Sequence, residues 1–171
     1  MNYYILEHEI NKGDKYVDFE SDMNLGLILE GQNSPKTYYQ GKNDTDYISG
    51  MYGMSEKAKD FFMSLNNPHL EFISTKVYHI DTDESLDLYL MKVNIELDCV
   101  DYEESELFML SDKKIRSIKK LVLKKDIINE EIFNIKNLLY SVTVNESLKN
   151  KMTDYGLKGF RFVSVDEYPL Y

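Results

Sequence analysis

The chain has 171 residues, of which 43% are hydrophobic, with 14 Tyr and 8 Phe. This length and apolar content predict one ordinary domain with its own core, and they exclude a largely disordered chain. The formal net charge of −10 disfavours nucleic acid and anionic membranes as partners and favours a basic protein, because opposite charges steer association.

The acidic residues are concentrated early in the sequence. Residues 1–110 contain 8 basic and 22 acidic residues, whereas residues 111–171 contain 12 and 8. A simpler alternative is that the net charge only keeps the protein in solution. The start, MNYYILEHEI, lacks the cationic segment of a secretory signal, and the single cysteine, Cys99, fits a reducing compartment. We therefore expect a cytoplasmic protein.

The first half of the chain predicts a strand, a long irregular region, a helix and a second strand. A first strand is predicted at Tyr3–Glu7. Residues 31–53 are rich in Gly, Asn and Pro and predict loop or irregular β-structure. Ser55 is a good N-cap for a helix that continues to Leu65. Residues 70–80 are rich in aromatic and β-branched types, which predicts a strand.

The second half predicts mostly strands. Residues 88–97 alternate so that Tyr89, Met91, Val93, Ile95 and Leu97 share one face, which predicts a half-buried strand. Asn145 caps a short helix that ends at Gly156. Further strands are expected at 120–124, 131–135, 140–144 and 160–165. Because strands and helices do not alternate, we predict an α+β fold with a largely antiparallel or mixed sheet and a few short helices. It is expected to form one domain, 1–171, with a variable β and loop part at 1–54.

No catalytic or cofactor-binding motif is found in the sequence. Phosphate-binding glycine loops and nucleophile elbows are absent, and three histidines with one cysteine lack the spacing of zinc ligands. The acidic neighbours of Cys99 are expected to raise its pKa and disfavour the reactive thiolate. We therefore predict no catalytic residue, no metal and no cofactor.

Two acidic clusters are the remaining candidate sites. The first, at 81–87, begins like a calcium loop but lacks the central glycine and has Val93 where the twelfth-position glutamate belongs. The second, from Asp98 to Glu106, could supply the paired carboxylates of a glycosidase or a metal-dependent nuclease. The simpler interpretation of both is an acidic surface, which in functional terms would dock a basic protein. The basic run 113–125 is interleaved with aliphatic residues and predicts an amphipathic segment.

Several short motifs occur in an order that resembles one protein family. They are the helix at Ser55, Leu88–Asn94, Asp98–Asp101, Ser105, Lys120–Leu123, Ile132–Phe133, Val144 with Leu148, and Gly156–Phe162. In this order they resemble the immunity proteins found beside bacterial polymorphic toxins. The resemblance covers residues 55–171 well and 1–54 poorly.

The resemblance implies a cytoplasmic antidote that binds a cognate toxin and blocks it without catalysis. The alternatives are a small enzyme that uses the carboxylates near Asp98–Glu106, and a general protein-binding domain without a toxin partner. The oligomeric state is left open. The residues expected to contact a basic partner are the acidic ones of the two clusters: Asp81, Asp83, Glu84, Asp87, Asp101, Glu103, Glu104 and Glu106.

Overall fold

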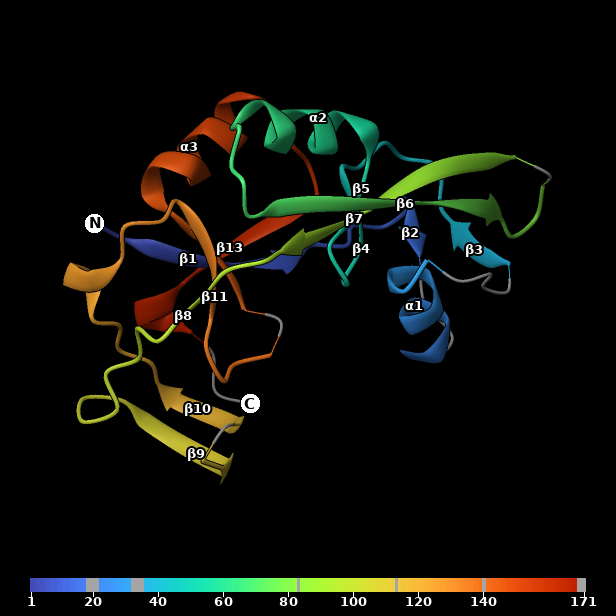
Figure 1. The fold of residues 1–171 in the computed structure, drawn as a ribbon. Helices are drawn as coiled ribbons and strands as arrows, with labels where there is room; N and C mark the ends of the chain where they lie inside the picture. Colours follow the sequence, from blue (N-terminus) through green and yellow to red (C-terminus); the bar gives the residue numbers. More distant parts are fainter. Residues whose placement is uncertain (18–21, 32–35, 83, 113, 140, 169–171) are drawn as a thin grey trace. The chain divides into compact units, whose positions relative to one another are not determined.

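The computed structural model describes residues 1–17, 22–31, 36–82, 84–112, 114–139 and 141–168. The chain divides into two compact units, each built from segments that are far apart in the sequence (Figure 1). Unit 1 comprises Met1–Glu7, Val93–Tyr155 and Arg161–Tyr171, and unit 2 comprises His8–Lys92 and Gly156–Phe160. The boundary expected after residue 54 falls inside unit 2, and the single domain stays a prediction. No helix in the described ranges is long and apolar enough to cross a membrane.

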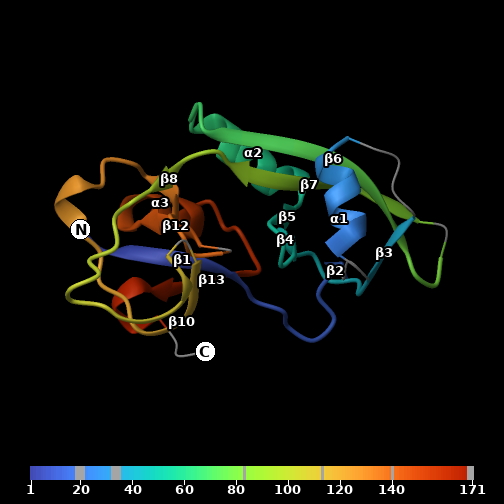
Figure 2. The same ribbon diagram turned by 60° about the horizontal axis from the view of Figure 1, so that its bottom comes forward.

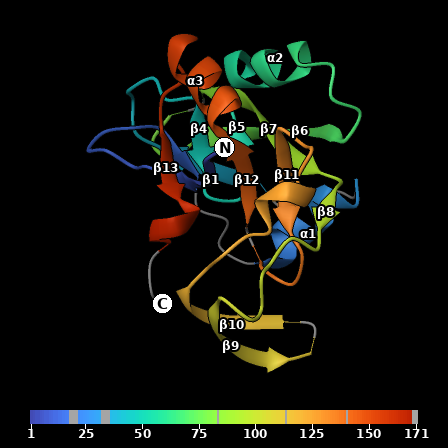
Figure 3. The same ribbon diagram turned by 90° about the vertical axis from the view of Figure 1, so that its left-hand side faces the viewer.

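Unit 1 is built on a five-stranded mixed sheet in the order β13-β1-β12-β11-β8 (Figure 3). The strands are β1 (Tyr3–His8), β8 (Glu96–Leu97), β11 (Ile132–Ile135), β12 (Val142–Asn145) and β13 (Phe160–Ser164). β12 runs antiparallel to both β1 and β11, whereas β8 runs parallel to β11. The ring of Tyr3 meets that of Phe133 edge-on, with 5.9 Å between ring centroids.

Helix α3 (Glu146–Asp154) starts directly at the end of β12. The side chain of Asn145 accepts the backbone N–H of Leu148 at 2.8 Å, which caps the helix as the sequence predicts. Leu148 and Met152, one turn apart on the same face, are fully buried. Tyr155, which follows the helix, is exposed. The short 3₁₀ helices η1 (Lys125–Ile127) and η2 (Val165–Glu167) complete unit 1.

A β-hairpin forms a separate two-stranded sheet in unit 1 (Figure 3). Its strands are β9 (Glu106–Ser111) and β10 (Lys114–Lys120), which pair antiparallel. Ile115 and Ile118 of β10 are buried in the core cluster of unit 1, and Leu107 of β9 packs against that cluster. An isolated two-stranded ribbon is only marginally stable in water, so these three aliphatic side chains anchor the hairpin.

Unit 2 is built on a six-stranded mixed sheet in the order β2-β3-β6-β7-β5-β4. The strands are β2 (Tyr16–Val17), β3 (Thr37–Gln40), β4 (Tyr47–Ser49), β5 (Gly53–Met54), β6 (Leu70–His79) and β7 (Ser85–Val93). β3 and β6 are parallel, whereas the pairs β2–β3, β4–β5 and β5–β7 are antiparallel. The long strands β6 and β7 are the two central strands of this sheet. Val77 of β6, together with Leu88 and Leu90 of β7, belongs to one buried core cluster.

Two helices flank this sheet (Figures 1 and 2). Helix α2 (Glu56–Ser64) begins after Ser55, whose hydroxyl accepts the N–H of Ala58 at 3.2 Å, and it buries Ala58, Phe61 and Phe62. Helix α1 (Asp22–Leu29), which the sequence analysis did not predict, buries Ile28 in the same core cluster as Val77 of β6.

The α+β class and the mixed sheets are as predicted, but two predicted strands are wrong. The strand expected at 88–97 is divided: β7 ends at Val93, and Glu96–Leu97 pair in the other sheet as β8. The alternating pattern continues through the break and therefore gives no sign of it. In addition, β7 is buried on both faces, because Leu88 and Leu90, off the predicted face, are as buried as Met91 and Val93. The strand expected at 120–124 is the end of β10 and an isolated bridge at Leu123.

The segment Gly156–Phe160 threads back into unit 2 beside the start of β4. The N–H groups of Asp46 and Tyr47 both donate to the carbonyl of Lys158, at 3.0 and 3.1 Å. Gly159 has φ +84°, and a Cβ there would lie 2.4 Å from the Thr45 hydroxyl and 3.0 Å from the Tyr47 carbonyl oxygen. Glycine is therefore required at position 159 both by the backbone conformation and by the closeness of β4.

Replacing Gly159 by alanine is expected to lower the free energy of unfolding by about 3 kcal/mol, from the positive φ and the clash with Thr45 and Tyr47 together. Gly156→Ala is the matched control, because Gly156 has φ +73° but open space around its Cβ position. It should cost only about 1 kcal/mol. Urea denaturation of both variants measures the difference, and equal losses would show that the contact with β4 imposes no constraint.

Candidate functional site

The first acidic cluster lies on the surface of unit 2. Asp81 and Glu84 are exposed in the turn between β6 and β7, and Asp83 lies outside the described residues. Asp87 is exposed on β7, with its carboxylate 3.5 Å from the ammonium of Lys76 on β6. The turn is anchored from inside by His79, whose buried imidazole accepts the N–H of Asp81 through Nδ1 at 3.2 Å. The cluster is a solvated loop, as the sequence favoured.

The second acidic cluster is a turn in unit 1. The carboxylate of Asp101 accepts the backbone N–H groups of Glu103 and Glu104, at 3.1 and 3.2 Å, so it stabilises the turn from within. The hydroxyl of Ser105 then joins the turn to the chain after β10: it accepts the N–H of Val122 at 2.9 Å. Glu103 and Glu104 are exposed, and within the described residues they form no ion pair.

Glu106 does not suit the general-acid role in the enzyme hypothesis. Glu106 is paired with Lys119, and this hydrogen bond and charge lower the pKa of Glu106, whereas a general acid needs a raised pKa. Asp98 points to Lys136, with 2.9 Å between carboxylate and ammonium. Within the part of the chain that is described, no group of three or more His, Cys, Asp or Glu is arranged to hold a metal ion.

Cys99 is fully buried in the core cluster of unit 1. Burial raises the pKa of its thiol to about 11, and the charge of Asp98 adds to the rise. The direction agrees with the sequence prediction, but the main cause is desolvation rather than the acidic neighbours. The thiol is therefore protonated at neutral pH.

A polar cavity of about 550 Å³ lies in unit 2. Its lining combines three lysines with four carboxylates: Lys15, Lys57, Lys158, Asp44, Asp46, Glu56 and Asp87. Lys15 pairs with Asp44 at 2.7 Å, and Lys57 lies 3.5 Å from Asp46. Because these charges largely neutralise one another, the cavity offers little net attraction to a charged ligand. A second cavity, of about 770 Å³, lies beside the first acidic cluster and is lined by Lys15, Lys42, His79 and Glu84 among others.

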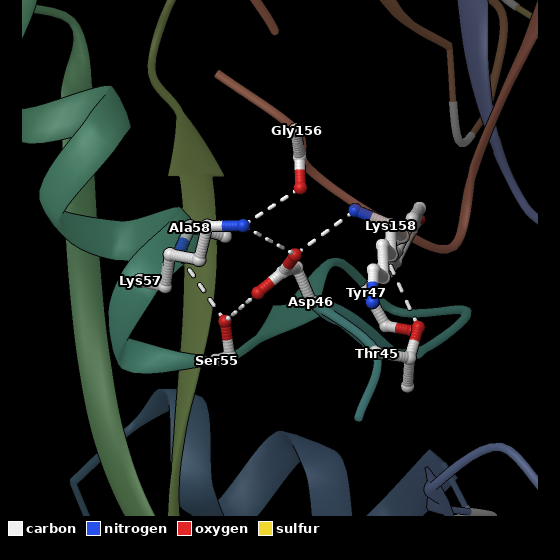
Figure 4. Close-up of polar contacts among 8 residues, drawn as sticks. All are labelled: Thr45, Asp46, Tyr47, Ser55, Lys57, Ala58, Gly156 and Lys158. Atoms are coloured by element: carbon white, nitrogen blue, oxygen red, sulfur yellow. Dashed lines mark hydrogen bonds and ion pairs between the residues drawn. The ribbon is translucent and has the colours of Figure 1, made fainter. Parts of the chain in front are cut away.

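Asp46 lines the first cavity and lies at the centre of the polar contacts drawn in Figure 4. It is only 7% exposed. Its carboxylate accepts the hydroxyl of Ser55 at 2.7 Å and the backbone N–H of Lys158 at 2.9 Å. Lys57, beside it, donates to the carbonyl oxygen of Gly156 at 2.7 Å (Figure 4). One carboxylate thus joins the start of β4, the N-cap of α2 and the segment 156–160.

The geometry assigns Asp46 a structural role. Its carboxylate oxygens are already satisfied by protein donors, and the Ser55 hydroxyl that it holds is the one that caps α2. Sequence reasoning did not find this residue, because Asp46 lies in the irregular region 31–53 and its partners come from 9 and 112 positions away. No local pattern marks such a pairing.

One known protein family matches most of the chain. The model of an immunity protein family (Imm11) matches residues 30–167. The chain belongs to this immunity protein family. The resemblance found in the sequence is therefore confirmed, and the match begins at residue 30, ahead of the helix at Ser55 where the resemblance was expected to start. A search of curated proteins finds no match.

Family membership gives the surface features their context. The matched range includes both acidic clusters, Asp46 and the hairpin β9–β10, whereas Lys15 of the first cavity lies outside it. Seven of the eight residues predicted to contact a partner are described, and they fall on two units: Asp81, Glu84 and Asp87 on unit 2, and the four residues from Asp101 to Glu106 on unit 1. Their role in partner binding stays a prediction.

Removing the Asp46 carboxylate is expected to destabilise unit 2. Asp46→Ala leaves the Ser55 hydroxyl and the Lys158 N–H without this acceptor and removes the ion pair with Lys57, which should cost about 3 kcal/mol of unfolding free energy. Asp44→Ala is the control, because its carboxylate is largely exposed and such a pair contributes about 1 kcal/mol or less. Chemical denaturation compares the two, and a loss below 1 kcal/mol for Asp46→Ala would contradict the assigned role.

Cys99 is expected to resist alkylation in the folded protein. At pH 8 the rise in pKa lowers the thiolate fraction about a hundredfold, and burial slows iodoacetamide further. Mass spectrometry of the native and the urea-unfolded protein after equal exposure measures the ratio. Equal rates would mean that Cys99 is accessible in the native state.

Proposed function

We propose that this chain is an immunity protein that binds a cognate bacterial toxin in the cytoplasm and blocks its activity without catalysis. The observation that carries the proposal is the family match over residues 30–167, which spans most of the chain. Immunity by direct binding needs a stable surface rather than a reactive group. The paired carboxylates and the buried, protonated Cys99 are consistent with that requirement.

The net charge of −10 supports a basic partner. Two exposed acidic clusters, one on each unit, provide negative potential that would accelerate encounter with a positively charged toxin surface. Rim charges of this kind act mainly on the association rate, whereas the dissociation rate depends on apolar contacts at the centre of an interface. A complete binding surface therefore needs an apolar component in addition to these clusters.

The test is protection of cells from the toxin encoded next to this chain. Co-expression should restore growth in the presence of the toxin, and the purified proteins should form a one-to-one complex by gel filtration and calorimetry. An immunity protein from an unrelated toxin system is the matched control and should not protect. Growth arrest despite co-expression, with no complex formed, would overturn the proposal. If this chain protected cells by chemically converting the toxin or the product of the toxin's reaction, it would act by catalysis, which contradicts the proposal.

A further inference from the structure

Strand β9 exposes an unusual amount of apolar surface. Phe108 is 72% exposed, Leu110 is 59% exposed and Met109, between them, is 39% exposed. No other strand in the described residues exposes three consecutive large apolar side chains. Single exposed apolar residues are ordinary on protein surfaces, but a contiguous group marks an interaction site.

The orientation of the hairpin explains why these side chains face outward. Leu107 packs against the core of unit 1, so strand alternation directs Phe108 and Leu110 to the opposite face of the ribbon. The buried residues of β10, Ile115 and Ile118, anchor the hairpin to the core. Phe108 and Leu110 therefore contribute little to the stability of the isolated chain.

β9 is also an edge strand. Its sheet contains only β10 and β9, and no further strand among the described residues pairs with the other side of β9 (Figure 3). Edge strands are commonly protected by Lys or Pro, or by bulges. The sequence of β9, ELFMLS, contains neither Lys nor Pro. The β9–β10 register does shift at three places, and such irregularity gives β9 some protection.

The charges around β9 indicate which occupant fits. Glu103 and Glu104 stand exposed in the turn just before the strand, and Asp101 fixes their backbone. A second copy of the chain would bring together two molecules that each carry a charge of −10, which opposes self-association. A segment with apolar side chains and a basic residue at one end matches both the strand and the turn.

We propose that the outer edge of β9 receives an extended segment of the toxin as an added strand. The segment contributes main-chain hydrogen bonds to β9 and an apolar pocket for Phe108 and Leu110, and a basic side chain at its end pairs with Glu103 and Glu104. This inference rests on the proposed function, since the toxin supplies the segment. Phe108 and Leu110 would supply the apolar contacts of the binding surface, which the acidic clusters do not provide.

The test compares two double variants for binding to the neighbouring toxin, inactivated by mutation. Phe108→Lys with Leu110→Lys places two charges on the edge and should weaken the complex about a hundredfold or more. Ile10→Lys with Met63→Lys is the matched control, because these residues are 53% and 55% exposed on unit 2 and belong to neither acidic cluster. The control should bind within about threefold of the unchanged protein. Thermal unfolding of all three proteins checks that each is folded.

A second measurement, on the unchanged protein, is independent of any substitution. Hydrogen exchange of the amides of residues 106–111 should slow when the toxin is bound, as added-strand pairing requires. Unaltered exchange in this strand, or unaltered binding by the Phe108 and Leu110 variant, would overturn the inference while leaving the proposed function intact. A dimer of the unchanged protein that the variant abolishes would identify a second copy as the occupant and also overturn it. If the unchanged protein does not bind the toxin, the proposed function itself fails.

Discussion

The arrangement of unit 2 depends on the buried carboxylate of Asp46. Burying an ionised group costs several kcal/mol unless hydrogen bonds and an opposite charge replace its hydration. Ser55, Lys57 and the backbone of Lys158 supply that replacement. The cost of burial makes the pairing specific, because any other packing of these segments would leave the charge uncompensated. The start of β4, the first turn of α2 and the segment 156–160 are thereby held in one geometry.

The acidic surface and the apolar strand divide the requirements of protein recognition between them. Exposed carboxylates act over a distance of about a Debye length and so affect how often two proteins meet. Apolar side chains act only in contact and determine how long the complex lasts. In unit 1 the two features are adjacent in sequence, since Glu103 and Glu104 directly precede β9. The acidic clusters alone were the sequence-based choice because charge is visible in a sequence, whereas exposure of Phe108 is not.

Local interactions were predictable from the sequence, and long-range ones were not. Ser55 and Asn145 were identified as helix caps because the capping oxygen and the backbone N–H that donates to it are only three residues apart. The break between β7 and β8 was missed because Leu88 to Leu97 satisfies one alternating pattern although the two halves join different sheets. The hairpin β9–β10 was missed because its basic residues suggested a solvated amphipathic segment. The hydrogen-bond partners of the Asp46 carboxylate are 9 and 112 positions away in the sequence, so only the folded chain reveals its role.

The pairing of β1 with β12 also constrains when unit 1 can fold during synthesis. Tyr3 lies opposite Asn145, 142 positions later in the chain. A ribosome adding about 5–20 residues per second needs roughly 7–30 s to make that distance. During this time β1 is outside the tunnel without its sheet partner, and the high sequence separation slows folding further. The core of unit 1 therefore forms late in synthesis, after the chain has been extended past Asn145.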